Sequence, residues 1–137
     1  MINFYKCMHC GNVVMFLNSS GVIPICCGDT MTEMTANSVD GAGEKHVPVI
    51  IVNKDRVIVA VGKTAHPMTS EHHIDWIVLE TNKGIHVTYL TLVSGRAEAE
   101  FALAKDERVI AAYEHCNLHG LWVKEETKEC GKDSCEI

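Results

Sequence analysis

The sequence predicts a mainly β protein, in which a small metal-knuckle domain precedes an immunoglobulin-like β-sandwich of about seven strands. Two observations support this prediction. Four of the seven cysteines fall within the first 27 residues, in two close pairs, which is typical of a short segment folded around a metal ion. From residue 47 onward, short apolar and β-branched runs are separated by turn residues, without the alternation of strands and long helices that characterises a parallel sheet.

The N-terminal segment, residues 1–36, is the predicted metal-knuckle domain. Cys7 and Cys10 are separated by two residues, Cys26 and Cys27 are adjacent, and a glycine follows each pair. Glycine permits the tight turn that lets both sulfurs of a knuckle face one ion. Four thiolates make a tetrahedral site that suits zinc or iron, and the spacing does not decide between these metals. Because adjacent side chains converge on one ion only with strain, we expect a distorted tetrahedron.

The second domain, residues 37–126, is the predicted β-sandwich, and it opens with a polar, glycine-containing linker. The expected strands are 47–52, 56–62, 74–80, 85–92, 98–104, 108–114 and 121–123. The region 97–112 is rich in alanine and glutamate and has helical propensity, but its two apolar runs flank a charged turn, so we interpret it as two strands. In the polar tail, residues 127–137, Cys130 and Cys135 are interpreted as free thiols, with a redox-active dithiol or a disulfide as the alternative.

The composition disfavours several classes of protein. Eighteen acidic and 12 basic residues give a net charge of -6, which argues against a nucleic-acid partner bound through its phosphates. No stretch approaches the roughly 18 apolar residues of a membrane span, and the N-terminus does not resemble a signal peptide, so a cytoplasmic protein without a membrane partner is expected. In a reducing compartment, an odd number of cysteines and eight histidines are more naturally metal ligands than disulfide partners.

A second set of potential ligands belongs to the larger domain. All of them fall in predicted loops or at strand ends: His46, His66, His72, His73, Cys116 and His119. A β-sandwich gathers its loops at two ends, so residues distant in sequence can meet there. Several imidazoles with one thiolate suit redox-active iron or copper better than structural zinc. The alternative is a closed structural zinc site with spare histidines.

Four cysteine- or histidine-bearing motifs occur in order between about residues 4 and 125: Tyr5-Lys6-Cys7-Met8-His9-Cys10-Gly11 with Cys26-Cys27-Gly28; Glu44-Lys45-His46-Val47-Pro48; His66-Pro67-Met68 followed by His72; and Cys116-Asn117-Leu118-His119-Gly120. Together they resemble the desulfoferrodoxin family, the two-iron form of superoxide reductase. The first motif resembles the rubredoxin-like (desulforedoxin) domain of that family, and the other three resemble its catalytic domain.

The resemblance implies two mononuclear iron sites. One iron is held by the four N-terminal cysteines, Cys7, Cys10, Cys26 and Cys27. The active iron is held by four equatorial histidines and an axial cysteine: His46, His66, His72, His119 and Cys116. His72 is assigned rather than His73 because its six-residue offset from His66 fits the spacing of the family. The sixth position is open in the reduced state, Glu44 occupies it after oxidation, and Lys45 lies beside the incoming substrate.

The activity implied by the resemblance is superoxide reduction, a one-electron reduction of superoxide to hydrogen peroxide that protects against oxidative stress. A rubredoxin-like electron donor and a homodimer are expected on the same ground. The alternatives are a non-catalytic iron electron-transfer protein, a small zinc-binding interaction module and a superoxide dismutase. Glu44 and Lys45 beside His46 favour the enzyme over an electron carrier, because a carrier needs neither a proton donor nor a guide for an anion.

Overall fold

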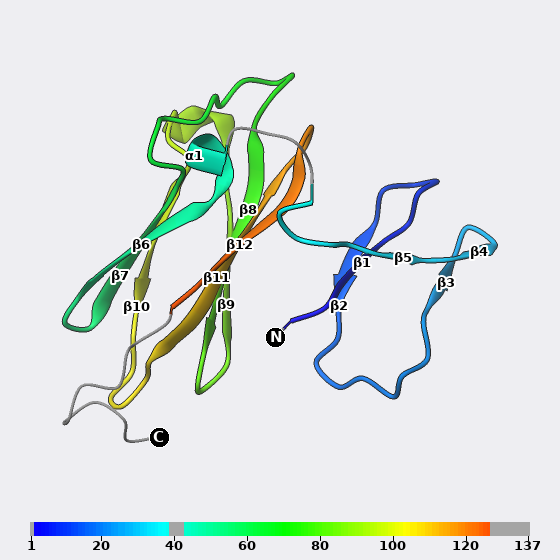
Figure 1. Ribbon diagram of the computed structural model, residues 1–137, viewed down its shortest axis with the longest axis horizontal. Helices are drawn as coiled ribbons and strands as arrows, with labels where there is room; N and C mark the ends of the chain where they lie inside the picture. Colours follow the sequence, from blue (N-terminus) through cyan, green and yellow to red (C-terminus); the bar gives the residue numbers. More distant parts are fainter. Residues whose placement is uncertain (1, 39–42, 127–137) are drawn as a thin grey trace. The chain divides into compact units, whose positions relative to one another are not determined.

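The computed structural model describes residues 2–38 and 43–126, and the chain divides into two compact units, Met1–Ala36 and Asn37–Ile137. Figure 1 shows the strands of each unit along the chain. Cys130 and Cys135 lie outside the described residues. Within residues 2–38 and 43–126, no helix has the length and apolar character needed to cross a membrane.

The first unit is built from very short strands around a very small core. Its strands are β1 (Phe4–Lys6), β2 (Val13–Met15), β3 (Ile25–Cys26), β4 (Asp29–Thr30) and β5 (Thr32–Glu33). They form a sheet in the order β2-β1-β5 and a separate β3-β4 hairpin. Its buried hydrophobic side chains are Phe4, Tyr5, Cys7 and Met31, and Phe16 packs against Tyr5. So little buried surface cannot stabilise a fold of this length without a further cross-link.

The second unit is the predicted sandwich of seven strands, preceded by one helical turn. Its elements are α1 (Gly43–His46), β6 (Pro48–Asn53), β7 (Arg56–Val61), β8 (Ile74–Thr81), β9 (Ile85–Tyr89), the 3₁₀ turn η1 (Leu92–Ser94), β10 (Glu98–Ala102), β11 (Val109–Cys116) and β12 (Gly120–Glu125). One sheet has the order β10-β7-β6 and the other β12-β11-β8-β9 (Figure 1). The strand interpretation of residues 97–112 is therefore confirmed by β10 and β11.

The core lies between the two sheets and follows the alternation of the strands. On β7, Val57, Val59 and Val61 are buried while the residues between them are more exposed. They pack against Ile77 and Leu79 of β8 and other inward-facing side chains. Because successive side chains of a strand point to opposite faces, the alternating runs of the sequence place these residues inside without any long-range information.

Two local details differ from the prediction. The strand expected over 85–92 ends at Tyr89, and the chain then enters η1, which Gly95 closes with a positive φ of 67°. His46, expected in a loop, lies in a helical turn closed by the bond from the Val47 amide to the Gly43 carbonyl (2.8 Å). Both details depend on individual backbone hydrogen bonds, which leave no periodic signal in a sequence.

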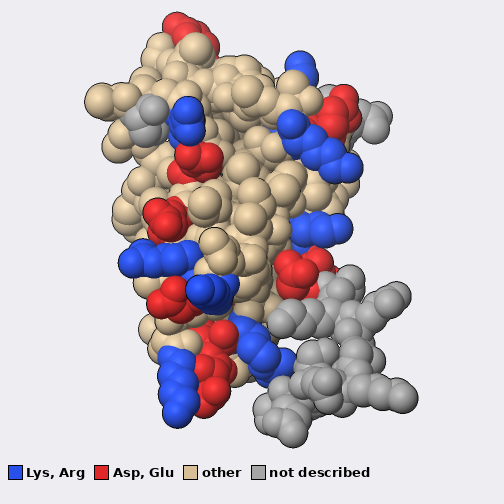
Figure 2. All heavy atoms as spheres, turned by 90° about the vertical axis from the view of Figure 1, so that its left-hand side faces the viewer, with Lys and Arg blue, Asp and Glu red and all other residues tan. Residues whose placement is uncertain are grey.

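In the second unit, the sheet β10-β7-β6 carries exposed charges of both signs. Figure 2 shows lysine and arginine side chains interspersed with aspartate and glutamate on the face it presents, rather than a field of one sign. Arg56 on β7 and Glu98 and Glu100 on β10 are among the exposed charged residues of this sheet. This pattern is not the basic surface that a phosphate-binding protein needs.

Glu107 joins three segments next to the β8–β9 turn. Its carboxylate accepts hydrogen bonds from the Thr81 hydroxyl (2.5 Å) and the Ala104 amide (2.8 Å), and it lies 2.8 Å from His86 Nε2. The bond from Thr81, followed by those from Ala104 and His86, lowers the pKa of Glu107 to about 2. A carboxylate that loses its proton more easily in the folded state stabilises the fold above its unfolded pKa.

Replacing Glu107 with glutamine is therefore expected to lower the free energy of unfolding at pH 7 by about 1–2 kcal/mol, the usual size for hydrogen bonds to a charged group. The difference from wild type should shrink as the pH falls from about 4.5 towards 2, because Glu107 then becomes protonated. Urea unfolding at several pH values measures it. Glu100→Gln, at an exposed position of β10, is the control, and an equal loss in both variants would contradict the prediction.

Candidate metal centres

Four cysteine sulfurs converge in the N-terminal unit. The sulfurs of Cys7, Cys10, Cys26 and Cys27 all lie within 4.8 Å of one another, and Cys10 Sγ is 3.6 Å from Cys26 Sγ. Two sulfurs bound tetrahedrally at about 2.3 Å from one ion would be about 3.8 Å apart. The four cysteines therefore fit a single tetrahedral metal ion.

The backbone around these cysteines is bent as the adjacent pair requires. Cys27 takes a left-handed φ of 54°, and Gly28 and Gly11 follow their knuckles with φ of 80° and 84°. The amide of Cys10 donates to Cys7 Sγ (3.4 Å), and this bond is the main reason that the pKa of Cys7 is lowered to about 6. Neighbouring sulfurs raise the pKa of Cys27 to about 12. Four thiolates are stable together only when a cation neutralises them.

In the second unit, four imidazoles form a closed ring. Contacts between ring centroids run from His46 to His66 (5.0 Å), from His66 to His72 (4.6 Å), from His72 to His119 (5.1 Å) and back to His46 (4.7 Å). Each of these pairs is close to perpendicular, at 71–79°. His46 and His72 are 6.5 Å apart and lie across the ring, so His66 and His119 occupy the other diagonal.

Cys116 lies against both ends of that second diagonal. Its Sγ is 3.6 Å from His66 Nε2 and 3.7 Å from His119 Nδ1. A sulfur close to two nitrogens at opposite corners lies near the axis of the imidazole ring. Donor atoms of His46, His72, Cys116 and His119 lie within 4.8 Å of one another. His66 is outside that mutual limit and joins the group through its contacts with Cys116, His46 and His72.

Short contacts identify the nitrogens that His66, His46 and His119 present to one another and to Cys116. His66 Nδ1 lies 2.7 Å from the Pro67 carbonyl and donates to it, which leaves the Nε2 lone pair facing Cys116. His46 Nε2 is 3.0 Å from His119 Nδ1, the separation of about 3.0 Å expected for two nitrogens at right angles around one ion. His73, by contrast, is turned away and contacts the Thr69 carbonyl and Asp75.

The donor set fits a transition-metal ion. His72 Nε2 is buried and has no hydrogen-bond partner among the described residues, which is costly unless it binds something else. Burial lowers the pKa of His66 to about 4, so this imidazole is neutral and can act as a ligand. Burial also raises the pKa of Cys116 although backbone amides of Leu118 and His119 donate to it, and a bound cation would reverse that effect. Four nitrogens and one thiolate are suitable ligands for iron.

Asn117 and Trp122 hold the ligand-bearing loops together. The His73 amide donates to Asn117 Oδ1 (2.8 Å), Asn117 Nδ2 donates to the Glu71 carbonyl (3.0 Å), and the Asn117 amide donates to the His73 carbonyl (3.1 Å). These three bonds bracket His72 and fasten it to the loop that carries Cys116. Trp122 stacks on His46 (4.9 Å, 22°) and donates its indole N–H to the His119 carbonyl (3.1 Å).

Asn117→Ala is expected to weaken metal binding at the ring about 10- to 100-fold, the usual effect of removing a group that orients metal ligands. The affinity is measured by competition with a chelator, and the four-cysteine site provides an internal reference. The control is Asn82→Ala, since Asn82 also joins two segments by bonds to Asp106 and Arg108 but does so away from the imidazoles. Equal affinities in the two variants would contradict the role of Asn117.

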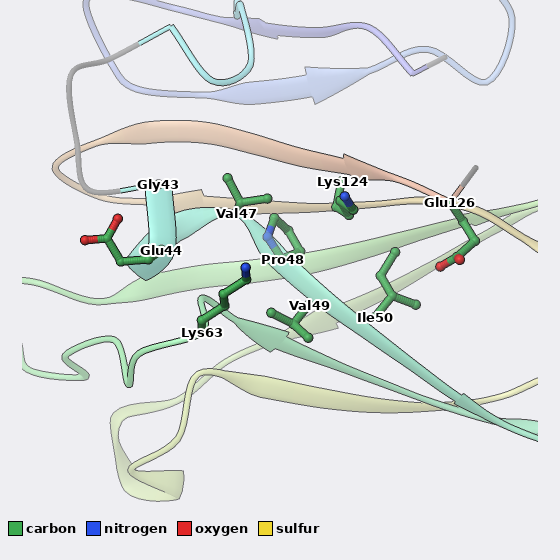
Figure 3. Close-up of a pocket in the computed structure, with 9 residues that line it drawn as sticks. All are labelled: Gly43, Glu44, Val47, Pro48, Val49, Ile50, Lys63, Lys124 and Glu126. Carbon is green, nitrogen blue, oxygen red and sulfur yellow. The ribbon is translucent and has the colours of Figure 1, made fainter. Parts of the chain in front are cut away.

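Glu44 and Lys45 lie on α1 next to His46 and are both exposed. The charge of Lys45 reaches the ring, because it is one of the causes, after burial and the histidines, that lower the pKa of His72. The Glu44 carboxylate is not among the atoms that converge with the imidazoles in the described part of the chain. In Figure 3 it projects from α1 away from the other labelled side chains.

A groove of about 480 Å³ lies beside this turn (Figure 3). It is lined by residues of α1 and β6 and by Val47 between them, by Lys63, by Lys124 of β12 and by Glu126, which follows β12. None of the ring imidazoles lines it. The groove therefore lies next to the candidate metal centre, and the donor atoms of that centre meet outside the groove.

The structure adds functional neighbours that sequence reasoning did not assign. Asn117 belongs to the fourth motif and Trp122 follows it by two residues, so their proximity to Cys116 and His119 in the sequence was the available signal. Glu114, with 0% exposure, precedes Cys116 by two residues on β11, and nothing in its local sequence indicates burial of a carboxylate. Gly62 contacts α1 through the backbone alone, and its sequence context shows only the end of a strand.

Both parts of the chain match models of known protein families. Residues 1–34 match the N-terminal domain of desulfoferrodoxin, and residues 38–125 match the desulfoferrodoxin family. The chain is 43% identical over 121 residues to a desulfoferrodoxin of Nitratidesulfovibrio vulgaris, covering 88% of this chain and 94% of that protein. It is 42% identical over 124 residues to a desulfoferrodoxin of Syntrophotalea carbinolica, covering 90% and 96%.

A solved structure shows the same similarity in three dimensions. The superoxide reductase of Treponema pallidum superposes with a TM-score of 0.77 at 38% sequence identity, over 91% of this chain and 99% of that one. The superposition therefore includes residues of both units of the chain.

Proposed function

Because the chain belongs to the desulfoferrodoxin family, we propose that it is a superoxide reductase with two iron centres. The observation that carries this proposal is the ring of four imidazoles with the Cys116 sulfur near its axis and a lysine on the adjoining turn. We assign Cys7, Cys10, Cys26 and Cys27 to the first iron. His46, His66, His72, His119 and Cys116 are assigned to the active iron.

The reaction takes superoxide, one electron and two protons to hydrogen peroxide. Iron bound at the ring would supply the electron and a position for the anion. The four imidazoles and the Cys116 thiolate would hold the ion, and hydrogen bonds from Leu118 and His119 orient the sulfur. Glu44, exposed on the same turn as His46, is proposed to close the site when product has left.

Lys45 is proposed to guide the anion and to deliver a proton. A net charge of -6 repels superoxide at long range, so a local positive charge has to dominate near the site. The Lys45 ammonium is exposed and one residue from His46. It holds a proton at Nζ that can reach the substrate anion through water.

Lys45→Ala is expected to slow the second-order reaction with superoxide about tenfold at low ionic strength and to flatten its salt dependence. Pulse radiolysis at several salt concentrations measures both quantities. Lys63→Ala removes the same charge from a residue that lines the neighbouring groove and is the matched control. If the Lys45 variant kept the rate and the salt slope of wild type, Lys45 would have no guiding role.

Product stoichiometry tests the proposed function directly. The reduced protein receives less superoxide than it has active iron, and hydrogen peroxide and oxygen are counted. Superoxide reduction yields one peroxide per superoxide and no oxygen. About half a peroxide per superoxide, with oxygen evolved, would instead mean dismutation and would refute the proposal.

We also propose a rubredoxin-like electron donor and a homodimer. Turnover requires an external one-electron donor, because each reaction leaves the active iron oxidised. Several apolar side chains of the N-terminal unit are exposed, among them Leu17 (85%), Val22 (73%) and Ile25 (73%), and such side chains commonly mark a protein contact. Sedimentation equilibrium tests the dimer, and superoxide-dependent oxidation of reduced rubredoxin tests the donor.

A further inference from the structure

Gly62, at the end of β7, touches the turn that carries Glu44, Lys45 and His46 through its backbone alone. Its φ is +78°, and a Cβ atom at this position would lie 2.5 Å from both the carbonyl carbon and the carbonyl oxygen of Lys45. The same Cβ would lie 2.6 Å from the Glu44 carbonyl oxygen. Any side chain at residue 62 would therefore displace α1, because the atoms it meets are backbone atoms.

Three consecutive amides after β7 bind the carbonyls of this turn. The Gly62 amide donates to the Val47 carbonyl (3.2 Å), and the amides of Lys63 and Thr64 donate to the Glu44 carbonyl (2.5 and 3.1 Å). β7 itself is anchored, since the Val61 amide donates to the Ala97 carbonyl (2.8 Å). Residues 62–64 thus form a backbone cradle on a fixed strand.

The turn depends on this cradle. α1 contains four residues, and a single helical turn is not stable by itself because its nucleation cost is not recovered. The side chain of His46 is held at the other end of the turn by Trp122 and the other imidazoles. Glu44 and Lys45 lie between these two anchors, so their backbone placement follows from the cradle and from His46 together.

We infer that Gly62 is a positioning residue for the reaction, which sets where Glu44 and Lys45 stand relative to the imidazole ring. This inference rests on the proposed function of that site. A methyl group at residue 62 should push the backbone of Glu44 and Lys45 outward while His46 stays in the ring, so the ligand set survives and the charge of Lys45 moves.

The test compares Gly62→Ala with Gly95→Ala. Gly95 also has a positive φ (67°), but a Cβ atom there meets nothing within 4 Å. Gly95→Ala therefore strains the backbone without a steric clash against another segment. We expect Gly62→Ala to keep its active iron. Its reaction with superoxide should be about tenfold slower, because small displacements of reacting groups commonly slow a reaction. The rate of this variant should also depend less on salt concentration. Gly95→Ala should keep the rate and the salt slope of wild type. Two variants with equal rates and salt slopes would overturn the inference.

A second measurement is independent of activity. Hydrogen exchange followed by mass spectrometry, with fragmentation to single residues, should show protected amides at Lys63 and Thr64 in the unmodified protein, and Gly62→Ala should lose that protection. If Gly62→Ala does not fold, hydrogen exchange in the unmodified protein still tests the inference. Amides of Lys63 and Thr64 that exchange as fast as exposed loop amides would show that the cradle does not hold the turn. Failure of the stoichiometry experiment would refute the proposed function while leaving these exchange rates unchanged.

Discussion

Replacing Cys26 with serine is expected to unfold the N-terminal unit and to leave the sandwich folded. Among the described residues, the unit has only four buried hydrophobic side chains, whereas the sandwich has its own core between two sheets. Structural metal binding supplies about 10–16 kcal/mol in small zinc domains, far more than so small a core provides. Loss of one of four thiolate ligands therefore removes most of the stability of residues 1–36.

Hydrogen exchange resolved along the chain measures this effect. Amides of β1 and β2 should exchange within the dead time in Cys26→Ser, while those of β8 and β11 should stay protected. Met8→Ser is the control, because Met8 lies in the same knuckle, is 69% exposed and offers no ligand in a four-sulfur site. Protection of β1 in Cys26→Ser equal to that in Met8→Ser would show that the unit folds without its metal.

Glu114 is the second residue whose replacement should have a large effect, and here the protein should become more stable. The side chain is fully buried, and neither carboxylate oxygen has a hydrogen-bond partner among the described residues. Burial, with a smaller effect from Asp75, raises the pKa of Glu114 to about 9. A buried polar group without a partner is destabilising, and a buried charge more so.

The sign of the pH dependence follows from this pKa. The unfolded chain loses the Glu114 proton near its ordinary pKa of 4.5, while the folded chain keeps it to about 9, so the folded state binds more protons between these values. Stability contributed by this residue therefore falls as the pH rises from 4.5 to 9, and by pH 7 the loss is about 3 kcal/mol. Glu114→Gln removes the titration, and Glu114→Met also removes the unsatisfied polar atoms.

Unfolding of the metal-free protein between pH 5 and about 9 tests the prediction. Glu114→Gln should remove this fall in stability, and Glu114→Met should be more stable than wild type at pH 7 by about 2–3 kcal/mol. In the iron-loaded protein the difference should be smaller, because a cation at the nearby Cys116 lowers the pKa of Glu114. Glu125→Gln, exposed on β12, is the control. A Met variant less stable than wild type would mean that the carboxyl group has a stabilising partner.

Most of the fold could be predicted because its signals are local. The run from Val57 to Val61 alternates in the sequence and its inward residues are buried in the structure. The turn at Lys54 and Asp55 joins β6 to β7 where the polar residues indicated it. The end of β9 at Tyr89 could not be predicted, because η1 and its closure by Gly95 depend on individual backbone hydrogen bonds.

The sequence by itself determined the candidate donors, His73 among them, because metal ligands are limited to a few residue types and the close spacing of Cys7 with Cys10 and of Cys116 with His119 is typical of ligand pairs. Only the tertiary structure decided how these donors are held. It turns His72 into the ring and His73 away, brings Asn117 against the loop of His73, and seats the turn of Glu44 on Gly62. The physical reason is that a side chain's chemistry is encoded at its own position, whereas its orientation is set by hydrogen bonds and close contacts with residues far away in the chain.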